Sequence, residues 1–564
     1  MTQSEKPRRR WPAVLAGALV VITGLGAAAW FNREALVLTA VKVAGRTADI
    51  APYAPPAWAT PPAPAAAPAT TPAQERPPNI IFILADDLGI NDISTFGGGL
   101  AGGAVRTPNI DALAASGAMF VNAYAGAASC APSRAMIMTG RYPTRTGMEF
   151  TPTPDGMSRV VSLLSDTRAS GLPPVIFNAA AAEAAPPFEQ QGLPGTEVTI
   201  AEVLKQAGYY TAHVGKWHTG LGPEFGPNAQ GFDDALVMAS GLYLPEDHPD
   251  VVNAKLPFDP IDKFLWARME YAASFNGGPV FEPGGYLTDW WTDEAVRVIK
   301  ANKDRPFFLN LAHWGIHTPL QATRADYEAV GPLQPERLRV YAAMLRALDR
   351  SVGRIVAALE AEGIADNTLI VFSSDNGGPG YIGIEGVNAP YRGWKLSLFE
   401  GGIRAPLFMK WPARITPRRI DTPAAHIDLM PTLAAAGGGR LPSDREIDGQ
   451  NLLPLATGAP AGPARPIFSR SGDYRVVRNG DCKLQLTGKP KKAWLFNLKD
   501  DPTERTDLAA ARPDKVAELT ALIVAQDAGR VPPLYPAQLE APVAIDRTLA
   551  QKVEPGDLVV YWPN

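Results

Sequence analysis

Five apolar segments of the chain each run directly into a cluster of polar residues. The segments are Asn79–Ala85, Met119–Tyr124, Tyr209–Val214, Phe307–Ala312 and Leu369–Ser374. Near-continuous apolar runs of this length are typical of strands that are buried on both faces of a sheet. Helical patterns lie between them, at 110–116, 200–207, 291–302 and 338–362. This alternation predicts an α/β fold in which helices cover both faces of a large, mixed, mostly parallel sheet.

The polar clusters follow the predicted strands rather than precede them. They begin at Asp86, Cys130, Gly215, His317 and Asp375. In open α/β sheets, ligands bind outside the carboxyl ends of the strands. We therefore expect the five clusters to converge at one edge of the sheet.

The N-terminal region does not share this pattern. A basic stretch that ends at Arg10 precedes Trp11–Phe31, which has almost no polar side chain. As a helix, Trp11–Phe31 is long enough to cross a membrane, and the basic residues before it predict a cytoplasmic N-terminus. We expect residues 1–34 to form a membrane anchor; a cleaved signal segment is the alternative, because Ala27–Ala29 provides small residues for cleavage. Both interpretations predict export, to the periplasm or another extracytoplasmic space.

A linker is expected next. Residues 51–78 contain ten Pro and ten Ala, a composition that is typical of an extended spacer. We therefore divide the chain into the N-terminal segment 1–34, a Pro/Ala-rich linker 35–78, a main domain 79–460, and a C-terminal subdomain and tail 461–564.

The composition is that of a globular protein, with 46% hydrophobic and 20% charged residues. The net charge of −4 gives no electrostatic reason to expect nucleic acid as a partner. Cys130 and Cys482 are the two cysteines of the sequence, so a disulfide framework does not explain Cys130.

Two adjacent pairs of oxygen donors, Asp86-Asp87 and Asp375-Asn376, follow separate strands. Ca²⁺ and Mg²⁺ prefer carboxylate and amide oxygens, whereas zinc prefers His and Cys. Adjacent aspartates repel one another unless a cation neutralises them. A loop or a helix cap would explain Asp86-Asp87 alone, but the second pair favours a site for one divalent cation.

Cys130 opens the run Cys130-Ala131-Pro132-Ser133-Arg134, which Thr139-Gly140-Arg141 closes. Pro132 and Gly140 frame a short predicted helix. Cys130 would lie at its N-terminus, where free N–H groups and the helix dipole stabilise an anion and lower the pKa of a thiol. Arg134, about one turn later, can point back at Cys130. A buried structural cysteine is the alternative.

These residues carry a resemblance to a known family. Cys130–Arg141 resembles the sulfatase signature C-x-P-S-R-x4-T-G-R, and Gly215–His218 resembles the family motif GKWHLG, with Thr219 in place of the leucine. His317-Thr318-Pro319 and the stretch 391–406, which contains Lys395, also resemble sulfatase motifs. The resemblance continues in unbroken order from about Asn79 to Leu508.

The resemblance implies a sulfuric ester hydrolase that cleaves aryl or carbohydrate sulfate monoesters. A formylglycine-generating enzyme would oxidise Cys130 to formylglycine, the nucleophile. Five metal ligands are implied for a single cation, Ca²⁺ in most of the family with Mg²⁺ as the alternative: Asp86, Asp87, Cys130, Asp375 and Asn376. The implied catalytic residues are Cys130, Arg134, Lys216, His218, His317 and Lys395.

The resemblance also implies that the tail forms a smaller C-terminal antiparallel sheet subdomain. Residues 143–196 and 221–290 carry no motif of the family, and long loops of this kind usually shape specificity. We predict that His213 and His313 are packed residues rather than catalytic ones. Two alternative functions stay open: a phosphonate or phosphodiester hydrolase of the same superfamily, and a membrane-anchored binding protein whose cysteine is never modified.

Overall fold

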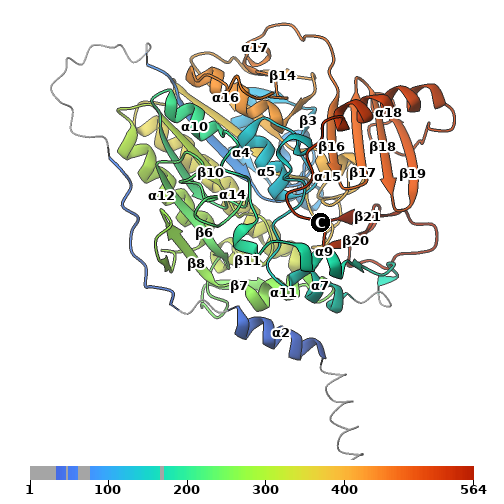
Figure 1. Cartoon of the computed structure of the whole chain (residues 1–564). Coiled ribbons are helices and arrows are strands. Elements are labelled where there is room, and N and C mark those ends of the chain that lie inside the picture. Colours follow the sequence, from blue (N-terminus) through green and yellow to red (C-terminus); the bar gives the residue numbers. More distant parts are fainter. Residues whose placement is uncertain (1–32, 46–48, 61–75, 166–169) are drawn as a thin grey trace, which may run out of the picture.

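The computed structural model describes residues 33–45, 49–60, 76–165 and 170–564. Its largest element in these ranges is a ten-stranded sheet of order β14-β2-β13-β12-β1-β10-β5-β6-β8-β9 (Figure 1). The strands are β1 (Asn79–Ala85), β2 (Ala118–Phe120), β5 (Tyr210–Gly215), β6 (Asp234–Gly241), β8 (Tyr271–Phe275), β9 (Val280–Phe281), β10 (Phe307–Ala312), β12 (Thr368–Ser374), β13 (Leu407–Lys410) and β14 (Arg418–Ile420).

Strand direction agrees with the predicted mixed, mostly parallel sheet. β12, β1, β10, β5 and β6 are consecutive parallel neighbours, and β13 and β8 pair with this group in the antiparallel sense. Four of the five predicted strands form as expected. The fifth prediction, Met119–Tyr124, is wrong: the segment is divided into β2 and β3 (Ala123–Tyr124), and β3 pairs with β15 (Ala424–Ala425) in a separate sheet. The chain changes partners here because Val121 N donates to Ile420 O and Asn122 O accepts from Ala424 N.

Helices cover both faces of the sheet, as predicted (Figure 1). Ile81 and Ile83 of β1 belong to the core under α4 (Pro108–Ala115), α12 (Leu287–Asn302) and α14 (Glu336–Ala361). Ile80 and Phe82 belong to the core under α5 (Cys130–Thr139), α10 (Ile200–Gln206) and α16 (Leu429–Gly437). Successive side chains of a strand point to opposite faces, which is why an unbroken apolar run suits this central position.

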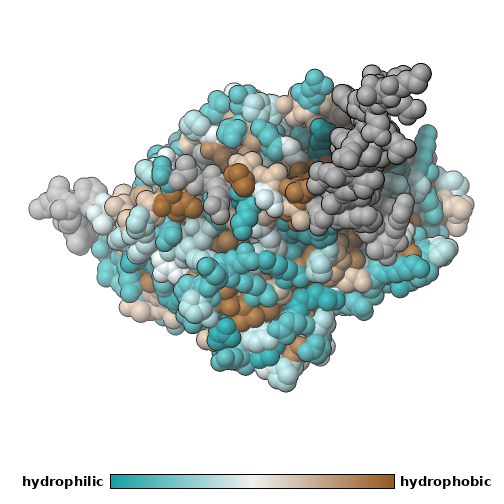
Figure 2. All heavy atoms as spheres, turned by 90° about the horizontal axis from the view of Figure 1, so that it is seen from below, coloured by the Kyte–Doolittle hydropathy of each residue, from teal (hydrophilic) through white to brown (hydrophobic). Residues whose placement is uncertain are grey.

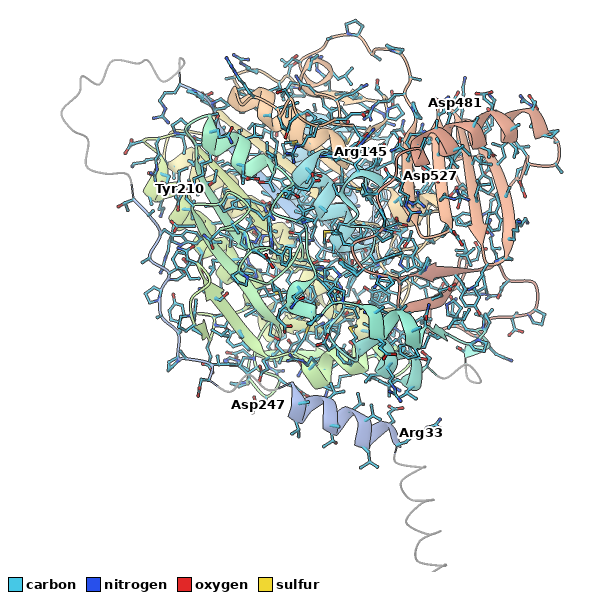
Figure 3. The ribbon with its side chains drawn as sticks, viewed as in Figure 1. Arg33, Arg145, Tyr210, Asp247, Asp481 and Asp527 are labelled. Carbon is cyan, nitrogen blue, oxygen red and sulfur yellow. The ribbon has the colours of Figure 1, made fainter. Side chains whose placement is uncertain are left out.

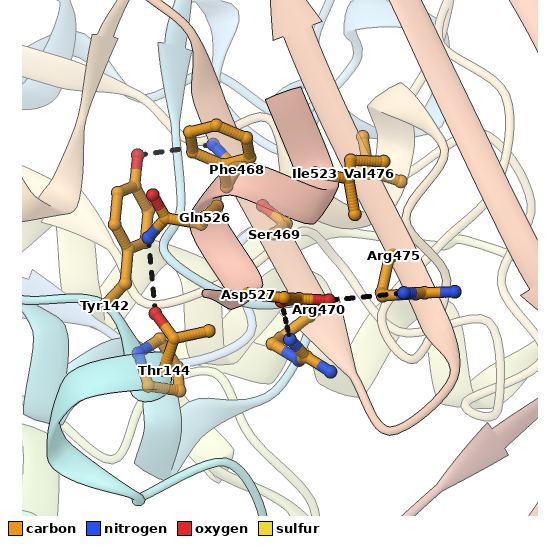
Figure 4. A pocket seen from close by; sticks show the side chains of 11 residues that line it. Tyr142, Thr144, Phe468, Ser469, Arg470, Arg475, Val476, Ile523, Gln526 and Asp527 are labelled. Carbon is orange, nitrogen blue, oxygen red and sulfur yellow. Dashed lines mark hydrogen bonds and ion pairs between the residues drawn. The ribbon is translucent and has the colours of Figure 1, made fainter. Parts of the chain in front are cut away.

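The expected C-terminal antiparallel sheet is present. It consists of β16 (Ile467–Ser471), β17 (Tyr474–Asn479), β18 (Cys482–Gly488) and β19 (Lys491–Asn497), and α18 (Pro513–Asp527) packs on one face (Figure 1). In Figure 3, Arg145 lies on the main domain, and Asp527, the last residue of α18, lies across the boundary on the C-terminal part. A cavity of about 20 Å³ at this boundary, shown in Figure 4, has room for little more than a water molecule.

A buried cluster of charges joins the two parts. Lys483 Nζ of β18 lies 2.9 Å from Glu400 Oε1 and 3.0 Å from Glu504 Oε1, and all three side chains have no exposed surface. Glu400 opens α15 (Glu400–Ile403) of the main domain and also accepts from Arg404 Nε at 2.7 Å. Burial and the nearby Glu400 raise the pKa of Glu504 to about 7, although Lys483 opposes the shift.

After α18 the chain returns to the main domain. β20 (Leu539–Ala544) pairs with β21 (Val559–Pro563) and with β4 (Ile176–Phe177). The remaining elements are β7 (Val251–Ala254), which pairs with β11 (Leu320–Thr323), and α3 (Leu100–Gly103), α6 (Pro143–Thr146), α7 (Met157–Leu164), α9 (Ala179–Ala184), α11 (Pro260–Arg268), α13 (Arg324–Val330), α17 (Leu453–Ala456), η1 (Ser94–Phe96), η2 (Phe188–Gln190) and η3 (His426–Asp428).

The predicted anchor at Trp11–Phe31 lies outside the described residues. Within the ranges that are described, no helix combines the length and the apolar character needed to span a bilayer. Helix α2 (Arg33–Ala44) lies against α11 and exposes Leu36 and Val43. Figure 2 views the molecule from this side and shows apolar patches among the hydrophilic side chains.

Part of the segment that was predicted to be an extended spacer contacts the fold. Ala51 N donates to Val280 O at 3.0 Å, so the chain at Ala51 lies beside β9 at the end of the large sheet. Trp58 packs edge-on against Phe275 and donates to Glu294 at 2.9 Å. The Pro/Ala composition did not indicate these contacts because the backbone of Ala51 and the single side chain of Trp58 make them.

Candidate active site

Two neighbouring strands bring the predicted oxygen donors together. β1 and β12 are parallel with Ala85 opposite Ser374, so Asp86-Asp87 and Asp375-Asn376 leave the same edge side by side. Asp87 N donates to Asp375 Oδ1 at 3.2 Å, and Asn376 Nδ2 donates to Asp87 Oδ1 at 2.8 Å. All four side chains are fully buried.

Cys130 is the first residue of α5, as the position of Pro132 predicted. Its Sγ lies 3.6 Å from Asp86 Oδ1 and 3.8 Å from Asp87 Oδ1. The expectation of a lowered thiol pKa is wrong for the unmodified residue. Burial and the nearby Asp375 raise the pKa of Cys130, and together they outweigh the opposing effect of the neighbouring ammonium groups.

Three buried cations compensate the carboxylates. Arg134 donates from Nε to Asp375 Oδ2 at 2.9 Å and from Nη2 to Asp86 Oδ2 at 3.1 Å. Lys216 Nζ lies 2.6 Å from Asp86 Oδ2. Lys395 Nζ lies 2.6 Å from Asp87 Oδ1 and 3.2 Å from Cys130 Sγ. Burial alone would raise the pKa of Asp87, but Lys395 and the neighbouring His317 lower it below the usual range.

His317 and His218 lie at the same site. His317 Nδ1 donates to Thr318 O at 2.6 Å, and its Nε2 lies 3.5 Å from Asp87 Oδ2. Burial lowers the pKa of His317 to about 3, although Asp87 opposes the shift. His218 is partly buried and has no partner for Nδ1; burial and the ammonium of Lys216 lower its pKa well below the usual value.

The turn after β5 explains how Lys216 and His218 reach the site. Gly215 has φ of +107°, and a Cβ there would lie 2.0 Å from Ala312 O. His218 has φ of +66° and Asp87 has φ of +60°. Left-handed backbone at residues with a Cβ costs about 1–3 kcal/mol and clusters at functional sites.

Sequence reasoning missed two residues of the site. Tyr381 OH donates to Asp87 Oδ2 at 2.6 Å and lies 3.1 Å from Lys395 Nζ. Trp314 stacks on His317 with 4.1 Å between ring centroids, and Lys216 Nζ lies 4.6 Å from the centre of its ring. Both lie in the loops that follow β10 and β12, outside the motifs that carry the resemblance.

Three other histidines have structural surroundings. His213 Nδ1 accepts from Asn310 Nδ2 at 3.0 Å, and His313 Nε2 lies 2.8 Å from Ser351 Oγ. Both are fully buried in the core, in agreement with the prediction that they are packed residues. His426 contacts Ser133 Oγ of α5 at 2.8 Å and supports the helix that presents Cys130.

The donor set fits a hard divalent cation. Asn376 Oδ1 is buried and has no hydrogen-bond partner, so this amide oxygen is free to bind a cation. One potential ligand atom from each of Asp86, Asp87, Cys130 and His317 lies within 4.8 Å of the other three. Carboxylate and amide oxygens in this number are the ligands that Ca²⁺ and Mg²⁺ prefer.

A cavity of about 380 Å³ opens onto these groups. Five of the six predicted catalytic residues line one end of it: Cys130, Lys216, His218, His317 and Lys395. The sixth, Arg134, does not line the cavity and donates hydrogen bonds to Asp86 and Asp375. A small anionic group in the cavity would face the ammonium groups of two lysines and the position of the nucleophile.

Comparisons with a family model and with known proteins all identify the same family. A family model described as Sulfatase matches residues 78–439. The chain is 34% identical over 406 residues to N-acetylgalactosamine-6-sulfatase of Homo sapiens, covering 71% of this chain and 69% of that protein. It is 32% identical over 457 residues to steryl-sulfatase of Mus musculus (70% and 67%), and 30% identical over 491 residues to arylsulfatase A of Homo sapiens (79% and 87%).

Solved structures show the same fold. The crystal structure of Ps i-CgsB in complex with k-i-k-neocarrahexaose superposes with a TM-score of 0.67 at 30% identity, covering 82% of this chain and 95% of the other. PsFucS1 sulfatase from Pseudoalteromonas sp. superposes with a TM-score of 0.62 at 25% identity, covering 81% and 91%.

Proposed function

The chain belongs to the sulfatase family and is a sulfuric ester hydrolase, and we propose that it acts through a formylglycine formed from Cys130 beside one divalent cation. The observation that carries this proposal is the placement of Cys130. Its Sγ lies at the N-terminus of α5, within 3.8 Å of two aspartates and 3.2 Å from Lys395. Cys130 also lines the cavity, where a substrate would reach this atom.

The cation would be held by Asp86, Asp87, Asp375, Asn376 and an oxygen of the modified residue 130, and we propose Ca²⁺ with Mg²⁺ as the alternative. When bound, the cation would supply positive charge to the sulfuryl oxygens and to the nucleophile. The unpartnered Asn376 Oδ1 supports this ligand set.

The charge balance of the site supports an anionic substrate. Three buried aspartates face three cations, Arg134, Lys216 and Lys395, so these side chains compensate one another. A divalent cation would leave an excess of positive charge in a buried cavity. A sulfate monoester and an ionised nucleophile each carry one negative charge, and together they would neutralise this excess.

The residues can be given roles from their positions. The hydrated aldehyde would supply two hydroxyl groups, one to attack sulfur and one whose deprotonation releases sulfate and restores the aldehyde. Lys216 and Arg134 would hold the charge of the sulfuryl group. His218, with its unpartnered Nδ1, would accept the proton of the second hydroxyl. His317 and Lys395, which lie together on Asp87, would bind the leaving oxygen, and the ammonium of Lys395 would supply its proton.

We also propose the partners and the location that this chemistry requires. A formylglycine-generating enzyme would act on Cys130, and the substrate would be a small-molecule or carbohydrate sulfate ester. Export past the cytoplasmic membrane, with residues 1–34 as an anchor or a cleaved signal, is expected to place the enzyme in the periplasm. Cell fractionation and N-terminal sequencing of the mature protein distinguish an anchored form from a secreted one.

Mass spectrometry of the peptide across Cys130 tests the central proposal. Active protein should contain formylglycine at position 130, and the Cys130→Ala variant should lose turnover of phenyl sulfate while it keeps its fold. Fully active protein with an unmodified thiol would exclude the formylglycine. Phenyl phosphate is the matched control substrate, and preferential turnover of this ester would favour the alternative phosphoester activity.

A further inference from the structure

The cavity beside Cys130 has two chemically different ends. One end carries the charged and polar groups of the site, Cys130, Lys216, His218, His317 and Lys395. Away from it, the wall is aliphatic and aromatic, and its members come from α7, η2, β6, α11, β20 and β21. The apolar members at this end include Met157, Val161, Phe188, Met238, Phe264 and Met269.

The apolar end is built from the parts of the chain that carry no sulfatase motif. Met157 and Val161 come from the region 143–196, and Met238 and Phe264 come from the region 221–290. The shared chemistry therefore lies at one end of the cavity, and chain-specific residues shape the other. Specificity in enzymes is commonly placed in such variable segments.

Most of the polar side chains at the apolar end bond to the protein itself. Thr153 Oγ1 donates to Thr151 O at 3.0 Å, and Asn564 Oδ1 accepts from Thr151 N at 2.8 Å. Ser240 Oγ accepts from Glu270 N at 2.7 Å, and Arg268 Nη1 donates to Gly45 O. Each of these four side chains already has a partner in the protein, so none is left without a hydrogen bond when a hydrocarbon group lies against it.

The wall formed by the described residues contains no Asp, Glu or Gln side chain. A sugar carries hydroxyl groups on most of its carbons, and each hydroxyl that leaves water without a partner weakens binding. An apolar group gains from the same surroundings because it leaves water for apolar side chains. The volume of about 380 Å³ lies in the range of pockets that enclose drug-sized ligands.

The wall is held in place from outside. Helix α11, which contributes Ile261, Phe264 and Leu265, is joined to α2 by Lys263 and Glu34 at 2.8 Å. Arg268 at the end of α11 bonds the backbone just after α2. The apolar end is therefore a supported part of the cavity rather than a gap between loops.

We propose that the natural substrate is the sulfate ester of an apolar alcohol, with a multi-ring or long alkyl-aryl leaving group, rather than a sulfated sugar. The proposal rests on the proposed function, since it assumes that the sulfate lies at the charged end. The hydrocarbon part then extends from the ester oxygen past Trp314 and Met269 and lies between α7, α11 and β6.

A series of 4-alkylphenyl sulfates tests the proposal on protein whose formylglycine content has been measured. With hydrogen, ethyl, butyl and octyl substituents, kcat/KM should rise by about fourfold per added methylene until the cavity is filled. For N-acetylgalactosamine 6-sulfate and glucose 6-sulfate, kcat/KM should be at least about 100-fold lower than for the octyl ester. A gain in kcat/KM of roughly fourfold for each methylene of the octyl chain accounts for a difference of this size.

Two substitutions on the same helix provide a matched comparison. Met157→Gln changes a residue of the wall, whereas Leu163→Gln changes a side chain that is 60% exposed and does not line the cavity. Met157→Gln should lower kcat/KM for the octyl ester by about tenfold and leave phenyl sulfate within about twofold. Leu163→Gln should leave both unchanged.

A binding measurement keeps the inference separate from catalysis. The Cys130→Ala protein, which needs no modification, should bind 4-octylphenol in isothermal titration, and Met157→Gln should weaken that binding while Leu163→Gln does not. If kcat/KM does not change along the alkyl series and the sugar sulfates are turned over efficiently, the inference is wrong but the proposed function still holds. Absence of turnover of every ester, phenyl sulfate included, by protein that contains formylglycine would overturn the proposed function instead.

Discussion

Substitution of Lys483 by Met tests the role of the buried charge cluster between the two parts of the protein. Lys483 lies 2.9 Å from Glu400 and 3.0 Å from Glu504, with no exposed surface on any of the three. Removal of one partner from a buried ion pair costs about 3–5 kcal/mol, because the remaining charge loses its compensation. We expect a loss of this size in Lys483→Met.

The loss converts into a small but measurable shift in the melting temperature. Unfolding entropies of about 2.1 cal/mol/K per residue give roughly 1 kcal/mol/K for about 500 residues, so the variant should melt about 3–5 °C lower. Differential scanning fluorimetry resolves such a shift. Lys491→Met, at an exposed position in the same sheet, is the control and should change the melting temperature by about half a degree at most.

A second substitution separates charge from packing. Lys483→Met combined with Glu504→Gln removes one charge of each sign, so part of the lost stability should return. If the double variant melts lower than the sum of the single effects, or if Lys483→Met behaves like Lys491→Met, the charge argument is wrong.

Three further predictions concern the site and its surroundings. Tyr381→Phe removes hydrogen bonds to Asp87 and near Lys395, so kcat/KM for phenyl sulfate should fall by about tenfold to a hundredfold, as expected for a bond to a charged group; unchanged kinetics would mean that Tyr381 is only a packing residue. Chelation should abolish activity and lower the melting temperature, and added Ca²⁺ should restore both. Asn376→Ala should need a higher Ca²⁺ concentration for the same thermal shift. An equal dependence on Ca²⁺ in the variant and the parent would remove Asn376 from the ligand set. Burial raises the pKa of Asp262 from 3.8 to about 8. The folded state therefore holds this proton more tightly, and the free energy of unfolding should fall as pH rises between about 4 and 8. Urea unfolding should show a weaker fall over this range in Asp262→Asn, and the same pH dependence in variant and parent would contradict the raised pKa.

The predicted strands and the convergence of polar clusters follow from simple rules that hold locally. Asn79–Ala85 and Phe307–Ala312 were predicted with the bounds that the structure shows, because an unbroken apolar run at the centre of a sheet leaves little choice of conformation. The oxygen donors after β1 and β12 meet because parallel neighbours end at the same edge.

Other features depend on contacts that no local pattern encodes. Met119–Tyr124 has the composition of a strand throughout. Its first half nevertheless pairs with β13, whereas its last two residues pair with β15. The raised pKa of the Cys130 thiol depends on its burial and on Asp375, which is far away in the sequence. The apolar half of the cavity combines residues from separate segments, so its chemistry became visible only when these segments were placed together.

The short stretch 49–60 also has a consequence for self-association. Ala51 of this stretch bonds both Val280 and Glu282 at β9, the last strand at this edge of the large sheet. An uncovered edge strand presents unpaired backbone groups to which a second molecule can add. A protein shortened to begin at Asn79 would keep every catalytic group but lose this cover, and it should form oligomers in sedimentation experiments under conditions in which the longer protein does not.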